Sequence, residues 1–308
     1  MEKLIVIAGP TASGKTACAV ELAKLVGGEV ISADSMLVYR GMDILSAKPD
    51  AAEMDGSPHH MLSVADPEEK FSCGAYREMA AAAIESVRAR GKTPILCGGT
   101  GLYIDSLTRP MSLGEKGSPA IREKYEKIAE AEGKEALHAM LAKVDPERAE
   151  KLHVNDLRRV VRALEIYELT GLTQTEREKS DRKGEALYEG CIYALDWPRE
   201  VLYDRINRRC GVMLEAGLLD EVKALMEREE KHPTSFQAIG YKEMTAAVRG
   251  EMSVEEALDL VRQASRNYAK RQLTWLRRDE RAMWIDCMGK TAREIAEIIR
   301  EKQEERNG

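Results

Sequence analysis

The sequence predicts an α/β fold in which a parallel sheet is interrupted by an all-helical insertion. Short apolar runs bounded by turn residues alternate with helical patterns through most of the 308 residues, which is typical of βα units. A glycine-rich segment joins the first apolar run to the first helical pattern. Between residues 111 and 187, strand-like runs disappear, charge is dense and the periodicity is helical. These three observations predict the fold class.

Six short apolar runs are the expected strands, and they comprise residues 4–8, 30–33, 61–64, 94–97, 192–195 and 283–285. Helices are expected after the first, third and fourth runs, at residues 16–25, 74–90 and 102–107. Each of these three begins after a Gly- or Ser-containing start, a common helix signal. The chain is again helical at 199–230 and 254–277. This alternation favours parallel strands with helices packed on the sheet.

The insertion is expected to hold helices at residues 119–131, 134–143 and 157–170. The polar segment 173–184 predicts a mobile connection. A chain of this length can bury one large core or two modest ones. We therefore predict a core domain of residues 1–110 and 188–308 that includes C-terminal helices, and a helical insertion of residues 111–187.

Residues 9–16 read GPTASGKT between the first expected strand and helix. This context predicts a phosphate cradle, because loop amides and a helix N-terminus point at an anion. Lys15 can reach a terminal phosphate, and the Thr16 hydroxyl can bind Mg²⁺, the one expected cofactor. The core should therefore be P-loop NTPase-like, with a nucleotide as the default ligand, although the cradle could hold any diphosphate. The predicted phosphate-binding residues are Gly9, Pro10, Thr11, Ala12, Ser13, Gly14, Lys15 and Thr16.

Two other expected strands end in polar residues. Asp34 follows the second strand, and open parallel sheets bind ligands at the carboxyl ends of their strands. We expect Asp34 to face the cradle, and the alternative is an aspartate that caps the turn before Met36. The fourth strand ends in GGTG at residues 98–101, where glycine lets a ligand approach the backbone. Thr100 can serve there both as a ligand contact and as a helix cap.

Histidine and cysteine give no metal signal. His59 and His60 are adjacent before an expected strand, and neighbouring side chains of an extended segment point to opposite sides. We expect turn or packing roles for both. The six cysteines include no C-x-x-C pair, so buried free thiols are expected and zinc is not.

Two expected helices carry clustered cations. Arg158, Arg159 and Arg162 line one broad face of the 157–170 helix. In the alternative, Arg159 and Arg162 each pair with an acidic residue three positions away, on a solvated surface. Residue spacing does not decide between that surface and a phosphate-binding face.

The last long helix carries a basic stripe. Its cations fall within about 80° on a wheel of about 100° per residue, and they are Arg262, Arg266, Lys270 and Arg277. A different sector holds Val261, Ala264, Tyr268 and Trp275. A solvated face usually mixes signs, and the acidic residues occur only before the stripe begins. The pattern therefore favours a polyanion lying across the helix.

Charge and hydropathy bound the remaining possibilities. The net charge of −6 argues against a uniformly basic coat. No apolar run reaches membrane-spanning length, and the first expected strand leaves no room for a signal peptide. We expect a cytoplasmic protein without membrane contact.

Seven segments, in order, resemble the motif series of bacterial tRNA dimethylallyltransferases (tRNA isopentenyltransferases). They read GPTASGKT, SADSMLVYRGMDILSAKP, GSPHH, GGTGLYIDSL, RALEIY, FQAIGYKE and SRNYAKRQLTW, and the likeness extends over residues 1–275. The resemblance implies transfer of a dimethylallyl group from dimethylallyl diphosphate to the exocyclic amine of the adenosine 3′ of the anticodon, with release of diphosphate. It also implies Mg²⁺, a P-loop core and a helical insertion that grips the anticodon stem-loop, and we expect a monomer.

The resemblance assigns roles to individual residues. The cradle would hold the allylic diphosphate and Arg209 would meet it, Asp34 would be the base near the target amine, and Thr100 would lie beside the reacting groups. The implied catalytic residues are thus Asp34, Thr100 and Arg209. The implied tRNA-binding residues are Asp34, Ser35, Met36, Leu37, Thr100, Arg158, Arg159, Val160, Val161, Arg162 and Gln237, to which the basic stripe adds Arg266 and Lys270.

Four positions depart from the family pattern. Leu37 stands where glutamine is common, so any role there would be steric. Leu45 and Ser46 replace a usual Gly-Thr, and Gly211 stands where an aspartate is usual after Arg209. None of the four belongs to the cradle.

Three other functions compete with the implied one. An adenylate isopentenyltransferase performs the same chemistry on a free nucleotide, but it would need neither the helical insertion nor the basic stripe. A small-molecule or nucleotide kinase would consume ATP without prenyl transfer. A non-catalytic P-loop RNA-binding module would leave Asp34 and Thr100 without a role.

Overall fold

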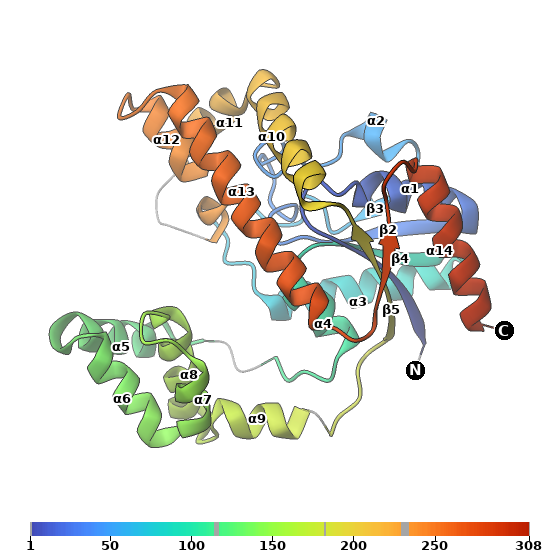
Figure 1. The fold of residues 1–308 in the computed structure, drawn as a ribbon. Coiled ribbons are helices and arrows are strands. Elements are labelled where there is room, and N and C mark those ends of the chain that lie inside the picture. Colours follow the sequence, from blue (N-terminus) through green and yellow to red (C-terminus); the bar gives the residue numbers. More distant parts are fainter. Residues whose placement is uncertain (1, 114–116, 182, 229–233, 308) are drawn as a thin grey trace. The chain divides into compact units, whose positions relative to one another are not determined.

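The computed structural model describes residues 2–113, 117–181, 183–228 and 234–307. The chain forms two compact units (Figure 1), one of Met1–Thr108 with Tyr188–Gly308 and one of Arg109–Leu187. We call them the core unit and the helical unit, and we describe each by itself.

The core unit is built on a six-stranded sheet whose paired strands are all parallel. The strand order is β3-β2-β4-β1-β5-β6. The strands are β1 (Lys3–Ala8), β2 (Gly28–Ala33), β3 (His59–His60), β4 (Thr93–Gly98), β5 (Glu189–Asp196) and β6 (Ala282–Asp286). The prediction of a parallel α/β core is confirmed.

Helices cover both faces of this sheet (Figure 1). The helices of the core unit are α1 (Lys15–Val26), α2 (Ala51–Met54), α3 (Cys73–Ala89), α4 (Gly101–Thr108), α10 (Arg199–Glu215), α11 (Leu218–Met226), η1 (Thr234–Gln237), α12 (Tyr241–Val248), α13 (Val254–Arg277) and α14 (Ala292–Asn307). Side chains of a strand alternate between faces, so Leu4 and Val6 pack with α3 and α4, while Ile5 and Ile7 pack with α1 and α14.

A third apolar cluster joins α10, α11, α12 and α13 to the segment after β2. It includes Val38, Leu45, Ile206, Leu218 and Val261. The long helix α13 begins at a Ser253–Glu256 capping box, in which each side chain accepts a backbone hydrogen bond of the other residue. These contacts bring α10 and α13 beside the carboxyl ends of β1 and β2.

Three predictions about individual elements differ from the structure. Residues 61–64 do not form the third strand, because Met61 and Ser63 have φ values of 63° and 52°, which an extended strand cannot contain; β3 instead comprises His59–His60. The 199–230 helix is divided at Gly217, whose φ is 101°, and its residues 229–230 lie outside the described residues. The connection predicted at 173–184 contains a helix, α9, and its residue 182 also lies outside the described residues.

Every described secondary-structure element of the helical unit is a helix: α5 (Pro119–Glu132), α6 (Lys134–Val144), α7 (Pro146–Lys151), α8 (Leu157–Thr170) and α9 (Gln174–Asp181). Asp145 links two of them, because its carboxylate accepts hydrogen bonds from the backbone N–H of Arg148 in α7 and of Thr175 in α9. The bond to Thr175 N is 3.0 Å long, and it fixes the start of α9 in the segment that polarity alone predicts to be mobile.

Candidate active site

The loop at residues 9–14 joins β1 to α1. Gly14 has a φ of 88°, a conformation that glycine adopts without strain, and α1 begins at the next residue. The Nζ atom of Lys15 donates a hydrogen bond to the Pro10 carbonyl at 2.7 Å. A helix N-terminus with a lysine in its first turn is a favourable place for an anion.

Side chains from distant parts of the core unit hold this loop. Trp197 Nε1 and Arg205 Nε each donate to a loop carbonyl, at 2.9 and 2.8 Å, and the guanidinium lies 4.4 Å from the indole centroid. Gln272 Oε1 accepts a 2.8 Å hydrogen bond from the Thr11 N–H. These side chains therefore hold the loop in one conformation.

Burial changes the proton affinity of the cradle lysine. It lowers the pKa of Lys15 from 10.5 to about 8, an effect to which the nearby Arg209 guanidinium adds and which the Asp34 carboxylate opposes. Desolvation disfavours the charged amine when no anion is present. A bound diphosphate would favour the charged form again, so this lysine is suited to a negatively charged ligand.

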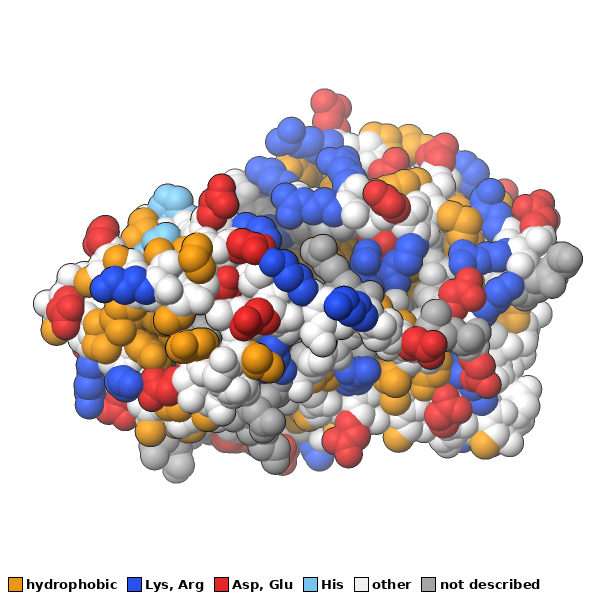
Figure 2. Space-filling model, turned by 90° about the horizontal axis from the view of Figure 1, so that it is seen from below, with side chains coloured by type: hydrophobic (Ala, Val, Ile, Leu, Met, Phe, Trp, Pro, Cys, Tyr) orange, Lys and Arg blue, Asp and Glu red, His pale blue; other side chains and the backbone are white. Residues whose placement is uncertain are grey.

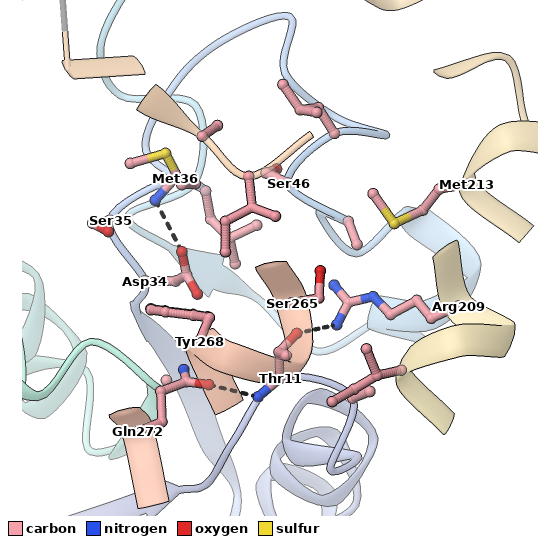
Figure 3. A pocket seen from close by; sticks show the side chains of 18 of the residues that line it. Thr11, Asp34, Ser35, Met36, Ser46, Arg209, Met213, Ser265, Tyr268 and Gln272 are labelled. Carbon is pink, nitrogen blue, oxygen red and sulfur yellow. Dashed lines mark hydrogen bonds between the residues drawn. The ribbon is translucent and has the colours of Figure 1, made fainter. Parts of the chain in front are cut away.

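A cavity of about 280 Å³ opens beside the cradle (Figure 3). It brings together many residues that the sequence singles out: Thr11, Ala12, Lys15, Thr16, Asp34, Ser35, Met36, Leu37, Arg209 and Gln237. Leu45 and Ser46, two of the positions that depart from the family pattern, also line it. Apolar side chains from α10 and α13, including Ile206, Met213 and Val261, complete the lining. The cavity thus combines basic side chains, a carboxylate and apolar walls.

Arg209 reaches the cradle from α10. Its Nη1 donates a 3.0 Å hydrogen bond to Thr11 Oγ1 (Figure 3), and burial lowers its pKa while Asp34 raises it. A Cβ atom added at Gly211 would meet nothing within 4 Å. An aspartate at position 211 would therefore begin in open space, and the glycine leaves the contact between Arg209 and Thr11 intact.

Asp34 follows β2 and faces the cavity, and both interpretations of it hold. Its Oδ1 accepts a 2.9 Å hydrogen bond from the Met36 N–H, which is the turn-capping geometry. The same side chain lines the cavity, as Lys15 and Arg209 do, and Figure 3 shows Asp34 and Arg209 in it. The hydrogen bond to Oδ1 therefore fixes the orientation of the Asp34 carboxylate in the cavity.

Thr100 lies at the end of β4 and is connected to the Asp34 segment. Its Oγ1 accepts a hydrogen bond from the Ser35 N–H at 3.1 Å, and its own N–H donates to Ala33 O at 3.1 Å. The hydroxyl therefore ties the ends of β2 and β4 together, a contact that the sequence does not predict.

Gln272 is a functional residue that the sequence interpretation missed. Its side-chain amide bridges two loops, because Oε1 accepts from Thr11 N and Nε2 donates to Gly99 O at 3.0 Å. A Cβ at position 99 would lie 2.1 Å from Nε2 of this amide, which explains the glycine there. No local pattern of α13 marks this glutamine, because its partners lie far away along the chain. Tyr268, one turn earlier, lines the cavity, and burial raises its pKa to about 12.

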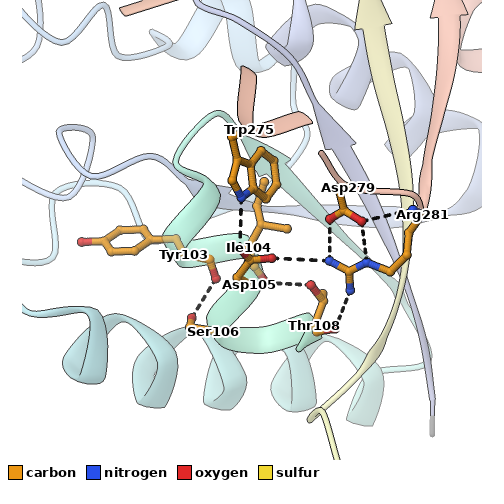
Figure 4. Close-up of polar contacts among 8 residues, drawn as sticks. All are labelled: Tyr103, Ile104, Asp105, Ser106, Thr108, Trp275, Asp279 and Arg281. Atoms are coloured by element: carbon orange, nitrogen blue, oxygen red, sulfur yellow. Dashed lines mark hydrogen bonds and ion pairs between the residues drawn. The ribbon is translucent and has the colours of Figure 1, made fainter. Parts of the chain in front are cut away.

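Polar contacts anchor the C-terminal end of α13 to α4 (Figure 4). Trp275 Nε1 donates to Asp105 Oδ2 at 3.0 Å. Arg281 pairs with Asp279 at 2.7 Å and donates to the Thr108 carbonyl at 2.6 Å. These contacts set the position of α13 along the sheet, and with it the positions of Tyr268 and Gln272.

The cavity offers few protein ligands for a cation. No group of three or more His, Cys, Asp or Glu side chains that could hold a metal occurs among the described residues. Thr16 and Asp34, two oxygen donors, line the cavity together. Such donors fit Mg²⁺ when a bound phosphate and water supply the remaining oxygens.

The arginine cluster of the helical unit has local partners. Arg159 pairs with Asp156 at 3.0 Å and Arg162 with Glu165 at 2.5 Å, where the Glu165 side chain is fully buried. Val160 and Val161 were predicted to bind tRNA, but they are 1% and 4% exposed in the core of this unit. The prediction is corrected for these two side chains, because their position on α8 packs them inward.

The basic stripe on α13 begins with an arginine that is paired with acidic side chains. Arg262 pairs with Glu255 and Asp259 at 3.0 and 2.7 Å, which contradicts the expectation that the acidic residues lie apart from it. Arg266 donates to Asn207 Oδ1 at 2.6 Å, and Lys270 is exposed. The stripe is therefore restricted to the part of α13 that follows Arg262.

Other observations concern the surface and the remaining polar groups. On the face drawn in Figure 2, Lys and Arg side chains lie among Asp and Glu side chains, without a uniform basic coat. No described helix has the length and apolar character needed to cross a membrane.

All six cysteines are free. His60 pairs with Glu29 at 2.7 Å, and His59 Nδ1 lies 2.8 Å from the Ser57 carbonyl oxygen, so both have the expected packing roles.

Comparison with known proteins identifies the class. The sequence model of the family described as IPP transferase matches residues 37–279. The tRNA dimethylallyltransferase of Halalkalibacterium halodurans is 45% identical over 311 residues, which cover 99% of each chain. That of Bacillus cytotoxicus is 46% identical over 300 residues, 97% of this chain and 94% of the relative.

Solved structures agree with this class. The full-length tRNA isopentenylpyrophosphate transferase of Bacillus halodurans superposes with a TM-score of 0.73 at 44% identity, over 100% of this chain and 98% of the other. A eukaryotic dimethylallyltransferase acting on tRNA superposes with a TM-score of 0.80 at 31% identity, over 94% of this chain and 75% of the other. The fold and these relatives thus define the class of the protein, an α/β transferase. The chain belongs to the IPP transferase family.

Proposed function

We propose that the protein is a tRNA dimethylallyltransferase that moves the dimethylallyl group of dimethylallyl diphosphate to the exocyclic amine of the adenosine 3′ of the anticodon. The observation that carries this proposal is the cavity in which Lys15 and Arg209 face the same space as Asp34. Its relatives named tRNA dimethylallyltransferase support the reaction and the RNA substrate.

The cradle side of the cavity would bind the donor. Breaking an allylic C–O bond places charge on the departing diphosphate, and donors that strengthen on that charge lower the barrier. Lys15, Arg209 and the loop amides are such donors. Mg²⁺, bound at Thr16, would neutralise part of the same charge. In this reaction the loop serves C–O cleavage, and no phosphoryl group is transferred.

The Asp34 side would receive the acceptor. The adenine amine is a weak nucleophile, and a carboxylate is too weak a base to ionise it directly. Once the N–C bond begins to form, the amine proton becomes acidic and a nearby carboxylate can accept it. Asp34 therefore orients the amine first and accepts its proton late. The base must leave the stacked loop to reach this site, at a cost of a few kcal/mol that backbone contacts along α13 could offset.

One assay tests this function against its competitors. Unmodified tRNA, radiolabelled dimethylallyl diphosphate and Mg²⁺ are incubated with the protein, with ATP in a parallel tube. Label in the tRNA supports the proposal, whereas label in free adenosine monophosphate identifies an adenylate isopentenyltransferase. Consumption of ATP without prenyl transfer identifies a kinase, and tRNA binding without either reaction identifies a binding module.

The affinity for diphosphate should fall as the pH rises above 8. The pKa of Lys15 is lowered from 10.5 to about 8 by burial, so above pH 8 the free protein must take up a proton to bind the anion, which costs about tenfold in affinity per pH unit. The same shift destabilises the folded protein below pH 8, and this effect fades as the pH approaches 10.5. Titration calorimetry with inorganic diphosphate between pH 7 and pH 9.5 measures the affinity. The Lys15→Met variant corrects for titration of the ligand, and equal slopes in both proteins would contradict the prediction.

Lys270→Ala should weaken tRNA binding several-fold and reduce the salt dependence. Lys270 is an exposed cation on α13, and loss of one phosphate contact lowers the slope of log Kd against log salt by about 1. Filter binding over a range of KCl concentrations measures the slope. Lys302→Ala, an exposed lysine on α14, is the control, and the same slope in both variants would count against the stripe as an RNA contact.

A further inference from the structure

The turn at residues 43–48 borders the cradle on two sides. Leu45, Ser46 and Ala47 line the 280 Å³ cavity. Ala47 also lines a neighbouring cavity of about 730 Å³, in which Lys15 and Thr16 again take part. A ligand that occupies the cradle therefore meets this turn, and the position of the turn shapes the donor site.

The backbone of the turn is strained. Ala47 has a φ of 48°, a left-handed conformation that residues with a Cβ rarely adopt and that persists only where the surroundings enforce it. Two backbone hydrogen bonds close the turn, from Ala47 N to Ile44 O at 2.9 Å and from Lys48 N to Asp43 O at 2.8 Å. These local bonds leave the N–H groups at the start of the turn to find partners elsewhere.

Glu221 of α11 supplies those partners. Its Oε2 accepts hydrogen bonds from the N–H groups of Asp43 and Ile44, both at 2.8 Å, and its Oε1 accepts one from Leu45 N at 2.7 Å. Three consecutive N–H groups that converge on one carboxylate form an anion-binding nest. Here the anion is a side chain of the same chain, more than 170 residues away. Bonds of this kind to an ionised acceptor are stronger than neutral ones.

Lys48 holds the other end of the turn. Its Nζ donates to Tyr39 O and Asp43 Oδ1 at 2.6 Å and to Ser63 Oγ at 2.8 Å, and its side chain is only 7% exposed. The ammonium group has three donors and all three are used. Lys48 and Glu221 therefore hold the turn from opposite ends.

Helix α11 does not need this contact to stay in place. Leu218, Val222 and Leu225 bury its apolar face in the core cluster that α10, α12 and α13 share. Glu221 lies off that apolar stripe, and its carboxylate is directed at the turn. The contact is thus separable from the packing that holds the helix.

We propose that Glu221 is a positioning residue for the prenyl donor, because it holds the 43–48 turn in the strained conformation that forms one wall of the donor site. This inference rests on the proposed function. Loss of the carboxylate releases three consecutive N–H groups and lets Ala47 relax, so the wall moves away from the cradle. The acceptor side keeps its own contacts, because Asp34 Oδ1 accepts a hydrogen bond from Met36 N and Thr100 Oγ1 accepts one from Ser35 N.

Glu221→Gln is the test, because an amide offers one acceptor oxygen where the carboxylate offers two. We expect KM for dimethylallyl diphosphate to rise about tenfold while kcat changes by less than about threefold and KM for tRNA stays the same. Asp220→Asn is the matched control, since the neighbouring Asp220 is exposed on the same helix and pairs with Lys223 at 3.1 Å. A mere loss of folded protein would lower kcat and leave both KM values unchanged, which would overturn the proposal.

A second variant tests the link to backbone strain. In the Glu221→Gln background, Ala47→Gly should recover part of the donor KM, because glycine adopts a positive φ without the strain that the carboxylate offsets. No recovery, or the same donor KM in Asp220→Asn as in Glu221→Gln, would contradict the proposal. If the wild type transfers no dimethylallyl group, the proposed function fails by itself. Calorimetry with inorganic diphosphate then still tests whether Glu221 positions the turn. Weaker binding in Glu221→Gln than in Asp220→Asn supports the proposal, and equal binding overturns it.

Discussion

Lys15→Met is expected to lower kcat for dimethylallyl transfer by about 10²–10³, the loss measured when one preorganised donor to a developing charge is removed. Lys15 is the first residue of α1, and its Nζ donates a hydrogen bond to the Pro10 carbonyl oxygen at 2.7 Å. Burial disfavours its charge and lowers its pKa to about 8, and a bound diphosphate favours the charged form again. Methionine keeps the length and apolar stem of the side chain, so the cradle should stay folded. Steady-state transfer to unmodified tRNA measures the effect.

Lys24→Met is the matched control for this variant. Lys24 lies on the same helix, but it is exposed and pairs with Glu21 at 3.0 Å. We expect its kcat to equal that of the wild type. If Lys15→Met retained more than a tenth of the wild-type kcat, the loop would not stabilise the leaving group as proposed, and a role in binding alone would remain.

Local patterns predicted those elements whose borders are set by local signals. The helix expected at residues 254–277 is α13 with the same bounds, because a Ser-Glu capping box starts it and its apolar and basic sectors are separate. The third strand could not be predicted in this way. Ser63 N and Val64 N donate to the carbonyls of Leu37 and Val38, and these distant partners fix the positive φ values that exclude a strand at residues 61–64. Periodicity carries no information about such pairings.

The residues of the candidate site also differ in whether local sequence signals predict them. The position of Asp34 at a strand end was sufficient to predict that its side chain faces the cavity, because parallel strands direct their carboxyl ends to one edge of the sheet. Gln272 and Glu221 act through backbone groups that are far away in sequence, and a polar residue within a helix gives no sign of such a partner. Arg159 and Arg162 show the converse: their spacing fits an RNA-binding face and a pair of local salt bridges equally well, and the structure contains the salt bridges.

Asp34→Asn is expected to lower the single-turnover rate by about 10²–10⁴, the contribution of a positioned general base, and to leave tRNA affinity unchanged. The amide oxygen of asparagine can still accept the hydrogen bond from Met36 N, which Asp34 Oδ1 accepts at 2.9 Å. The turn therefore keeps its conformation and only the proton acceptor is lost. Asp34→Ala should lose turnover as well, but it also removes the bond to Met36. Rapid quench with saturating enzyme and labelled donor measures the chemical step, and filter binding measures the affinity.

Asp196→Asn separates loss of the base from loss of a carboxylate at the edge of the sheet. Asp196 ends β5 on the same parallel sheet, but its residue is exposed and it does not line the cavity. It should react at the wild-type rate. Wild-type-like single-turnover rates in Asp34→Asn would mean that water or the leaving diphosphate accepts the amine proton and that Asp34 only orients the base. In that case the acceptor side of the cavity would act through geometry alone.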